Sequence, residues 1–440
     1  KRTNKVFKNV NTKAEFENLI KNSDYAQNKN RVFKNFIDID TKATDQEFSG
    51  RCWLFAFLNI IRLPMMKKYD LEEFEFSQNY LFFYDKLEKA NFYFKYIFNN
   101  KNTKLDDIKL IHMLDNLTND GGQWNMFVNL IEKYGIVPKT NMDDHYHSKN
   151  SEDLNTFYND FLRKAAKRIR SSGENRDKLL QELLYECYKI LTIFLGEPPQ
   201  KITWEYYKKN DKNGNKNNTE KTYQSVNNIT PLHFYKKYVP YDAKNKVCLI
   251  NYPCSHAPFY KLYNVELGFT IFDGIQQNYI NVPINIMINA VKKSIDIKEA
   301  VWTGVDFGKF RSGKEGYLDK DGFNYEDVFD FNNVMNKCDS LEYRQSKPDH
   351  AIVIRGYNFG KDTKNGFLVE NSWGEENKGK NKAEFKGNYY MAEEWFKDYV
   401  YLVVVDKKCV SKKEYDVLKK KPIILPYWSP FGVVLKGGIK

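Results

Sequence analysis

Residues 46–56 have the sequence QEFSGRCWLFA, which places Cys52 at the start of an apolar run and a glutamine six residues before it. The apolar residues that follow, as far as Met66, have the spacing of a buried helix, and Ser49-Gly50 is typical of the turn before a helix. We therefore expect Cys52 in the first turn of that helix. Unpaired backbone amides and the helix dipole favour an anion at this position, so we expect a lowered thiol pKa.

Two strand-like runs far downstream contain candidate partners for this thiol. His350 precedes the apolar run 351–357, and Asn371 follows the apolar run 367–369. If these runs form adjacent strands, His350 and Asn371 meet at one end of the pair. A neutral amide beside an imidazole fixes its tautomer, and Trp373 can shield that hydrogen bond from water.

Acyl transfer by a thiolate also needs donors for the tetrahedral oxyanion. The side-chain amide of Gln46 and the backbone amide of Cys52 are the candidates, and Trp53 is a supporting aromatic residue. Taken singly, each residue has a structural interpretation: a cysteine beside tryptophan is more often in the core, and a histidine often caps a strand. The combination of Gln46, Cys52, His350 and Asn371 instead predicts a nucleophile with its base, its orienting amide and its oxyanion donor.

This combination resembles the papain-type cysteine peptidases, in which an aromatic residue follows the nucleophile and histidine and asparagine lie downstream. Ser49 stands where secreted members have a disulfide-forming cysteine, and this difference favours a reducing compartment. His350 lies 298 residues after Cys52, whereas the separation in papain itself is about 130–150 residues. Large insertions are therefore expected between the two parts of the site.

Further segments narrow the resemblance to the bleomycin hydrolase branch, the cytosolic cysteine aminopeptidases. These segments are EFSQNYLFFYDKLE at 75–88, DGGQW at 120–124, KYGIVP at 133–138, GEPP at 196–199 and LPYWSPFG at 425–432. The resemblance implies a homohexamer whose active sites face a central cavity, and some members bind DNA without sequence specificity. It also implies an aminopeptidase that removes N-terminal residues from peptides with a free N-terminus.

The C-terminal segment bears on how this resemblance is interpreted. In the family the chain ends inside the cleft, where its carboxylate meets the amine of the substrate. Here we expect the stretch from Leu435 to Lys440 near that amine, although the chain extends about five residues beyond the usual end, and Ser429 replaces the usual acidic residue before proline. The extra residues are trimmed, or block the site, or belong to an enzyme that acts as an endopeptidase.

The expected fold is α+β: a papain-like two-lobed core, with a helical half and a β-barrel-like half, a large helical insertion, and arms at both termini. The expected divisions are an N-terminal arm at 1–40, the helical half at 41–149, and a helical insertion for oligomerisation or channel lining at 150–230. The β-rich half with His350 and Asn371 is expected at 231–410, and a C-terminal arm that enters the cleft at 411–440. The polar segment 208–218 is expected to be a mobile loop.

Composition agrees with a globular enzyme without a metal or cofactor. The chain has 440 residues, of which 42% are hydrophobic and 16% aromatic, and these proportions exclude a disordered protein. Its cysteines, at 52, 187, 248, 254, 338 and 409, form no C-x-x-C pair and have no histidine at zinc spacing. Without the apolar core of a signal peptide or a membrane-spanning run, the expected location is the cytoplasm, with no membrane partner.

The net charge of +12 and the pI near 9.0 suggest nucleic-acid binding as a second function class. The best basic patch is the helical segment 163–170, for which a solvated helix face is the alternative interpretation. The function alternatives are therefore a papain-like endopeptidase, if the C-terminal arm leaves the cleft open, and a nucleic-acid-binding ring protein with secondary peptidase activity.

Overall fold

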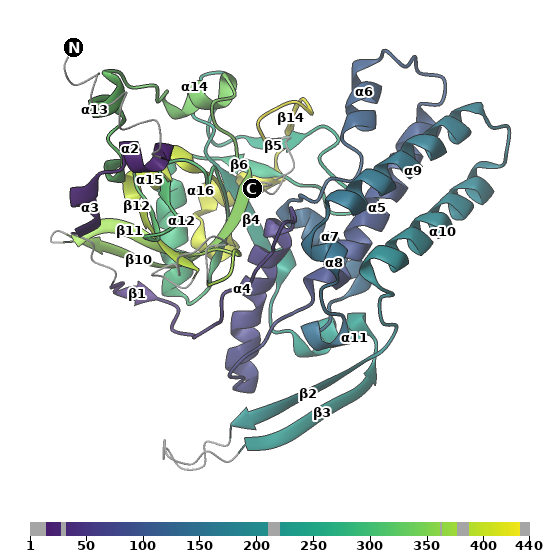
Figure 1. Cartoon of the computed structure of the whole chain (residues 1–440), viewed down its shortest axis with the longest axis horizontal. Helices are drawn as coiled ribbons and strands as arrows, with labels where there is room; N and C mark the ends of the chain where they lie inside the picture. Colours follow the sequence, from purple (N-terminus) through teal and green to yellow (C-terminus); the bar gives the residue numbers. More distant parts are fainter. Residues whose placement is uncertain (1–14, 28–31, 210–220, 361–362, 376–386, 432–440) are drawn as a thin grey trace.

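The computed structural model describes residues 15–27, 32–209, 221–360, 363–375 and 387–431. Figure 1 shows a β-rich region on one side of the molecule, a group of long helices on the opposite side, and a two-stranded hairpin that extends from the body. The central helix α4 (Cys52–Tyr69) lies between the first two of these regions. Its position explains why the first part of this helix, residues 52–58, has no charged residue on any side.

The helical half is built around α4, α5 (Gln78–Asn99) and α7 (Trp124–Tyr134). Fourteen of the 18 residues of α4 are buried, so this helix is a core element without a solvent face. Phe57 stacks on Trp124 with 4.2 Å between ring centroids, which joins α4 to α7. The hydroxyl of Ser77 caps α5 by accepting a hydrogen bond from the amide of Tyr80 at 3.0 Å.

The β-rich half contains one mixed sheet. Its strands, in spatial order, are β14 (Ile423–Leu425), β5 (Leu262–Val265), β6 (Tyr279–Asn281), β4 (Lys246–Ile250), β13 (Val400–Asp406), β7 (Val301–Val305), β10 (His350–Gly360), β11 (Thr363–Glu370), β12 (Asn388–Ala392), β9 (Tyr317–Leu318) and β8 (Arg311–Ser312), and β1 (Asn35–Phe36) pairs with β10. The expected adjacent strands are confirmed, because β10 and β11 pair antiparallel. The helix α12 (Ile284–Asp296) packs against β10 and β13.

The insertion is helical only in its first part. α9 (Glu152–Ser171) and α10 (Arg176–Leu195) pack against α5, as expected. The prediction of a helical block to residue 230 is wrong for its last third, where β2 (Ile202–Lys209) and β3 (Lys221–Ile229) form an antiparallel hairpin. Aromatic residues that alternate along the chain favour a strand. Trp204 and Tyr206 alternate in this way, and their rings stack with 4.2 Å between centroids. Most of the predicted mobile loop, 210–218, lies outside the described residues.

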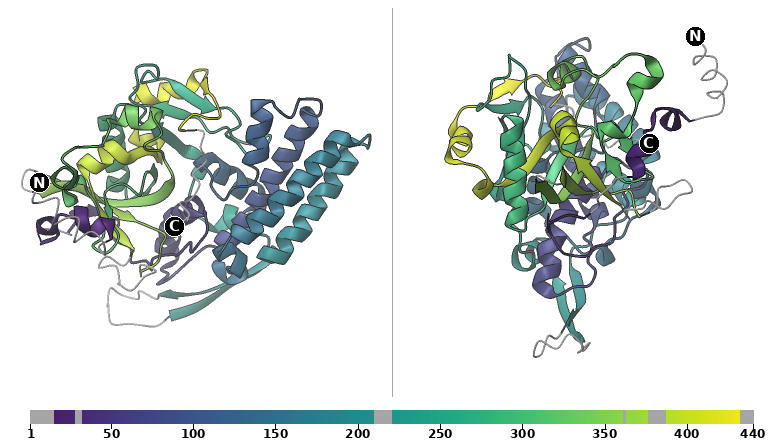
Figure 2. Two further views of the ribbon diagram at one scale, coloured as in Figure 1. Left: turned by 45° about the horizontal axis from the view of Figure 1, so that its top comes forward. Right: turned by 90° about the vertical axis from the view of Figure 1, so that its left-hand side faces the viewer.

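Shorter elements complete the chain. The helices are α2 (Phe16–Ile20), α3 (Ser23–Gln27), α6 (Ile108–Asp115), α8 (Tyr146–Lys149), α11 (Pro231–Tyr238), α13 (Tyr325–Phe329), α14 (Lys337–Glu342), α15 (Glu393–Tyr399) and α16 (Lys412–Tyr415). The left view in Figure 2 shows the long helices of the insertion on one side of the molecule and the sheet on the other, and in the right view these helices lie behind the sheet. Within the described ranges, no helix is long and apolar enough to cross a membrane.

The cysteines differ from the expectation in one respect. Cys254 and Cys338 form a disulfide with 5.2 Å between their Cα atoms, although the sequence showed no pairing and Ser49 favoured a reducing compartment. Their separation of 84 residues leaves no local spacing pattern from which the pair could be recognised. The other four cysteines are free and buried. In the described part of the chain, no three His, Cys, Asp or Glu side chains are grouped so that they could hold a metal ion.

Candidate active site

Cys52 is the first residue of α4, as predicted, and its side chain is 0% exposed. Burial, with a smaller contribution from the charge of Asp349, raises the pKa of its thiol to about 12, although the backbone amides of Ala351 and Trp53 oppose this shift. The expected lowering of the pKa by the helix start is therefore wrong for the resting thiol. Desolvation outweighs the amide groups, so a thiolate here requires a base that accepts the proton.

His350 and Asn371 meet at the ends of neighbouring strands. His350 begins β10, Asn371 directly follows β11, and His350 Nε2 lies 2.7 Å from Asn371 Oδ1. An amide oxygen only accepts hydrogen bonds, so Nε2 carries the proton of the neutral ring and Nδ1 keeps the lone pair. The Ala351 amide beside the Cys52 thiol belongs to the residue after His350. The fold thus brings Cys52 to the strand end that carries this imidazole.

Aromatic rings surround the imidazole. The ring centroids of Trp373 and Phe307 each lie 5.0 Å from that of His350, and both His350 and Asn371 are at most 2% exposed. The guanidinium of Arg311 lies over the Trp373 ring at 4.8 Å. Trp373 therefore occupies the shielding position that the sequence predicted, and Phe307 is a second shielding ring that the sequence did not identify.

Gln46 is buried and connects the two halves. Its side-chain oxygen accepts a hydrogen bond from Ser372 Oγ at 2.9 Å, and its Nε2 donates to the carbonyl of Ser49 at 2.6 Å. The backbone amide of Gln46 also donates to the carbonyl of Ser372 at 2.9 Å. Because an amide nitrogen has two hydrogens, the bond to Ser49 leaves one N–H of Gln46 for another acceptor.

The loop before Cys52 is closed by side-chain bonds. Ser49 Oγ donates to the carbonyl of Gln46 at 2.6 Å and accepts from Arg51 Nε at 2.9 Å. The guanidinium of Arg51 is fully buried and pairs with Asp144 at 2.5 Å. Although burial opposes ionisation, Arg51 holds the pKa of Asp144 below its ordinary value. Hydrogen bonds and a buried ion pair thus close this loop.

Asp120 contacts this loop and was not identified as a site residue from the sequence. Its Oδ2 accepts the backbone amide of Gly50 at 2.9 Å, and its carbonyl accepts Trp53 Nε1 at 2.6 Å. Gly122 packs so closely on Trp53 that an added Cβ would lie 2.6 Å from the indole ring. The only available signal was an acidic residue beside two glycines, which also occurs in ordinary turns.

A buried group of three charges joins the elements that carry the predicted residues. Glu370, directly before Asn371, pairs with Arg62 of α4 at 2.7 Å and with Arg355 of β10 at 2.8 Å. The three side chains are between 3% and 8% exposed. One carboxylate therefore connects the helix of Cys52 to the strands of His350 and Asn371.

The C-terminal arm passes toward the same region. Trp428 accepts a hydrogen bond at its carbonyl from Arg344 at 2.7 Å, and the buried ring of Phe431 packs on Tyr252 with 5.2 Å between centroids. Phe431 lines a small cavity together with Gln123, which directly follows Gly122. Residues 432–440, including the predicted cleft segment Leu435 to Lys440, lie outside the described residues.

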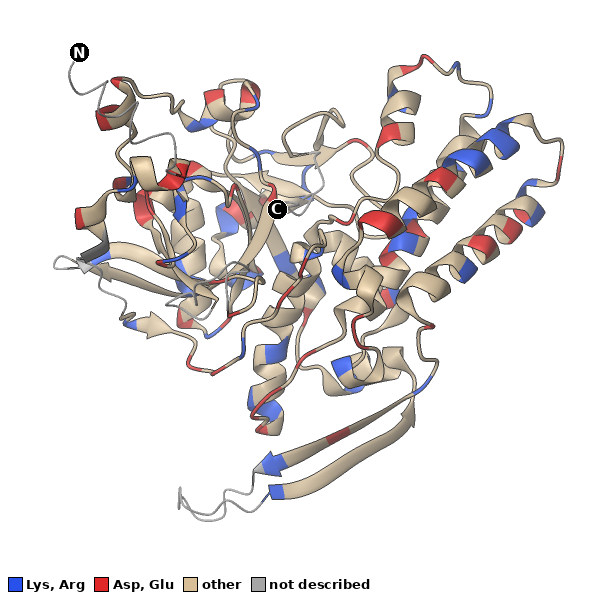
Figure 3. Cartoon of the chain, viewed as in Figure 1, with Lys and Arg blue, Asp and Glu red and all other residues tan. Residues whose placement is uncertain are grey.

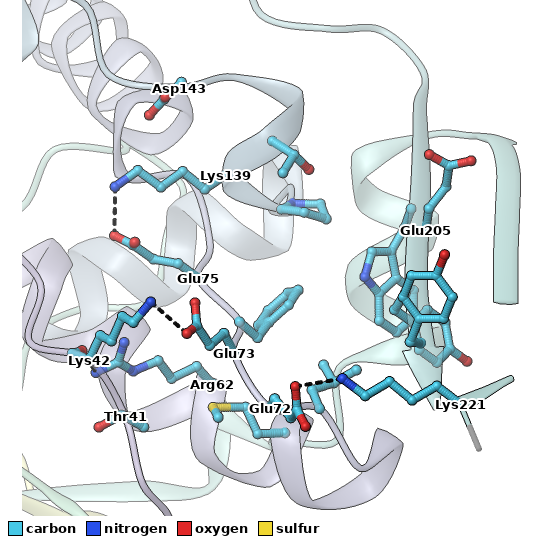
Figure 4. A pocket seen from close by; sticks show the side chains of 18 of the residues that line it. Thr41, Lys42, Arg62, Glu72, Glu73, Glu75, Lys139, Asp143, Glu205 and Lys221 are labelled. Carbon is cyan, nitrogen blue, oxygen red and sulfur yellow. Dashed lines mark hydrogen bonds and ion pairs between the residues drawn. The ribbon is translucent and has the colours of Figure 1, made fainter. Parts of the chain in front are cut away.

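A larger pocket of about 610 Å³ lies away from these residues, between the end of α4 and the hairpin (Figure 4). Six of its charged side chains form three ion pairs: Lys42 with Glu73 at 2.6 Å, Lys139 with Glu75 at 3.0 Å and Lys221 with Glu72 at 2.9 Å. None of the predicted site residues lines it.

Two arginines of the basic segment 163–170 pair with neighbouring carboxylates. Arg163 pairs with Asp160 at 3.1 Å, and Arg168 pairs with Glu182 at 2.7 Å and with Glu174 at 3.1 Å. Arg170 donates to the backbone carbonyls of Asn100 and Thr103. Figure 3 shows acidic and basic residues interspersed along α9 and α10. This pattern favours a solvated helix face over a nucleic-acid surface.

Comparison with known proteins agrees with this geometry. The model of the Peptidase C1-like family matches residues 1–432. Bleomycin hydrolase of Rattus norvegicus is 37% identical over 423 residues, which cover 93% of this chain and 90% of the relative. Aminopeptidase C of Listeria monocytogenes is 36% identical over 404 residues, with coverages of 91% and 88%.

A solved structure is similar over the same range. The crystal structure of PepW from Lactobacillus rhamnosis has a TM-score of 0.87 and 34% identity, and the match covers 94% of this chain and 91% of that one. The fold is therefore the mixed helix-and-sheet fold expected from the sequence. With a family match over nearly the whole chain and relatives above 30% identity, this chain belongs to the Peptidase C1-like family.

Proposed function

We propose that the chain is a cysteine aminopeptidase of the papain-like type, in which Cys52 is the nucleophile, His350 the base and Asn371 the group that orients His350. The observation that carries this proposal is the 2.7 Å contact between His350 Nε2 and Asn371 Oδ1, next to the strand residue whose amide reaches the Cys52 thiol. The similarity to proteins named aminopeptidase C and bleomycin hydrolase supports the same reaction class.

The reaction follows from the positions of these groups. His350 Nδ1 takes the proton of Cys52 Sγ, and the thiolate attacks the carbonyl carbon of the first peptide bond. The oxyanion receives hydrogen bonds from the Cys52 amide and from the free N–H of Gln46. His350 then protonates the leaving amine, and afterwards takes a proton from the water that attacks the thioester.

The raised pKa of Cys52 gives His350 a particular role. A buried thiol with a pKa of about 12 does not ionise alone at neutral pH. Proton transfer to the adjacent imidazole creates an ion pair, so the positive charge of His350 stabilises the thiolate that desolvation disfavours. The hydrogen bond to Asn371 and the rings of Trp373 and Phe307 hold the imidazole in place for this transfer.

Specificity for a free N-terminus is assigned to the C-terminal arm. In the described part of the chain, the arm accepts a hydrogen bond from Arg344 and packs through Phe431 beside Gln123. A carboxylate at the closed end of the cleft would pair with the amine of the substrate and restrict cleavage to the first bond. Such a pairing would account for removal of single N-terminal residues.

The remaining expectations form part of the same proposal. A cytoplasmic location is supported by Ser49 in place of the disulfide cysteine and opposed by the disulfide between Cys254 and Cys338. A homohexamer is supported by the resemblance to bleomycin hydrolase. Non-specific DNA binding has weaker support, because Arg163, Arg168 and Arg170 already have partners.

The test compares free-amine with N-acetylated aminoacyl fluorogenic substrates. We expect cleavage of the free-amine substrates and little cleavage of the blocked ones. Removal of residues 433–440 should increase cleavage of the blocked substrates relative to the full-length protein, which is the control. Equal cleavage of both substrates by the full-length protein would show an endopeptidase instead.

Mass spectrometry of the purified protein addresses the end of the arm. An intact Lys440 in a fully active preparation would show that trimming is not required, whereas loss of the last residues with time, in the wild type but not in Cys52→Ala, would show that the enzyme trims itself.

A further inference from the structure

A group of buried charges lies behind the nucleophile loop. α5 carries Asp85, Lys86 and Lys89, and the segment before α7 carries Asp120; the four side chains are between 0% and 8% exposed. Lys89 pairs with Asp85 at 2.5 Å and donates to the carbonyl of Gly121 at 2.7 Å. Lys86 pairs with Asp120 at 2.7 Å. The ion pair Lys86–Asp120 and the hydrogen bond from Lys89 to Gly121 thus connect α5 to the segment that packs on the nucleophile helix, whereas the pair Lys89–Asp85 lies within α5.

Only the second of these pairs reaches the loop of Cys52. Asp120 Oδ2 accepts the amide of Gly50 at 2.9 Å and the hydroxyl of Ser151 at 2.5 Å. Its Oδ1 accepts Lys86 Nζ at 2.7 Å and Asn155 Nδ2 at 2.9 Å. With four donors on one carboxylate, the side chain of Asp120 is held in a single orientation.

Asp120 also contacts the chain on the other side of the nucleophile. Its backbone carbonyl accepts the indole N–H of Trp53 at 2.6 Å. Gly50 and Trp53, which flank the segment Arg51-Cys52, are therefore both bonded to Asp120. The side chain of Asp120 accepts from the Gly50 amide, and its main-chain carbonyl accepts from the Trp53 indole. The direction of the Cys52 amide depends on the peptide units between these two contacts.

We propose that Asp120 is a positioning residue for the nucleophile. Asp120 holds the Cys52 loop through the Gly50 amide, and Lys86 and Ser151 fix the carboxylate of Asp120. This inference rests on the proposed function, because positioning matters only if Cys52 performs the chemistry. Misplacing the Cys52 amide by a fraction of an ångström removes an oxyanion donor from its position, and such displacements lower the rate of the chemical step more than the binding of substrate.

The charge of Asp120 provides a second, independent readout. Although burial favours the protonated acid, Lys86, Ser151 and the Gly50 amide hold the pKa of Asp120 well below its ordinary value, so it is ionised at neutral pH. This negative charge is among the causes that raise the pKa of the Cys52 thiol. Replacing the carboxylate by an amide therefore makes the thiol easier to ionise while the loop becomes less well positioned.

The experiment measures kcat, KM and the pH midpoint of Cys52 alkylation by iodoacetamide in Asp120→Asn. We expect kcat to fall about 10- to 100-fold with KM within about 3-fold, and the alkylation midpoint to move to lower pH. Lower activity with an easier-to-ionise thiol is not expected of a residue that only stabilises the fold.

The matched control is Glu88→Gln on the same helix. Glu88 is also buried and pairs with Lys133 at 2.5 Å. Its side chain also accepts a hydrogen bond from Tyr134, which places it on the face of α5 toward α7. This variant loses a buried carboxylate without touching the Cys52 loop, so kcat and the alkylation midpoint should match the wild type even if the melting temperature falls.

A gentler variant keeps the proposal testable if Asp120→Asn does not fold. Ser151→Ala removes one neutral donor from Asp120 Oδ2, and we expect kcat to fall about 3- to 10-fold with KM unchanged. Wild-type kcat in a folded Asp120→Asn or Ser151→Ala protein would overturn the proposal, as would an equal loss in Glu88→Gln. Failure of the proposed function is separate, because it would appear as unchanged hydrolysis in Cys52→Ala.

Discussion

The two sides of the candidate site are held in different ways. On the helical side, the loop of Cys52 is fixed by charges that are buried with it, as in the pairs Arg51–Asp144 and Lys86–Asp120. On the sheet side, His350 is held by a neutral amide and two aromatic rings. A buried charge that loses its partner is costly, whereas a ring that loses one neighbour keeps the others. Substitutions should therefore have sharper effects on the first side than on the second.

The largest effect is expected at the nucleophile itself. Cys52→Ala removes the attacking atom, so hydrolysis of aminoacyl fluorogenic substrates should fall by at least about 10⁴-fold. The circular dichroism spectrum and oligomeric state should be those of the wild type, because the thiol is a small buried group. Retention of a substantial rate in this variant would contradict the assigned chemistry.

The next largest effect is expected at Glu370, which connects the two sides, and it concerns the stability of the fold. Glu370→Gln removes the charge that pairs with both Arg62 and Arg355, and two buried guanidinium groups then lack their counter-charge. We expect the free energy of unfolding to fall by about 3–5 kcal/mol, measured by urea denaturation.

Asp160→Asn is the control for this substitution, since Asp160 is a mostly exposed partner of Arg163. Exposed pairs contribute little, so this variant should differ from the wild type by no more than about 1 kcal/mol. Similar losses in the two variants would show that burial of the Glu370 group is not what makes it important.

On the sheet side, Asn371→Ala should be milder than Cys52→Ala. The substitution removes the acceptor at His350 Nε2, but the rings of Trp373 and Phe307 still confine the imidazole. We expect kcat to fall about 10²-fold, with little change in the melting temperature. A loss as large as that of Cys52→Ala would show that the amide, and not the aromatic packing, positions the base.

The smallest effect is expected at Asp349, directly before His350. Burial, reinforced by the charge of Asp306, raises the pKa of Asp349 to about 6. Its Oδ1 is buried and, among the described residues, has no hydrogen-bond partner. The folded protein therefore holds this proton more tightly than the unfolded chain, and stability falls as the pH rises from about 4 to 6.

Asp349→Asn should remove this cost. The variant should be more stable than the wild type by about 1–3 kcal/mol at pH 7.5, and the two proteins should be equally stable below about pH 3, where the carboxyl is protonated in both states. Urea unfolding at the two pH values checks this. A destabilised variant at pH 7.5 would show that the charge of Asp349 has a favourable partner.

The elements that carry the site could be predicted because their signals are local. The apolar runs that became α4, β10 and β11 are continuous in sequence, and the expected strand pairing followed from their short connection. Cys52, His350 and Asn371 were recognisable because the chemistry requires those residue types beside such runs. The position of His350 against Asn371 agrees with the prediction to the level of a hydrogen bond.

Other features depend on contacts between distant residues and had no local signal. Asp120 and Glu370 are ordinary acidic residues until the fold places Gly50 beside the first and Arg62 beside the second. The raised pKa of Cys52 results from complete burial, which the helix-start argument did not include. The hairpin after α10 was missed because charged residues interrupt its alternating aromatic pattern.

Ser49 has a practical consequence for work with this protein. Cysteine nucleophiles oxidise readily and are kept active with thiol reductants. In a loop closed by a disulfide, the same reagents would attack the closure. Here the hydrogen bonds of Ser49 with Gln46 and Arg51 contain no sulfur, so dithiothreitol can be used at concentrations that keep Cys52 reduced while the loop that presents it stays closed.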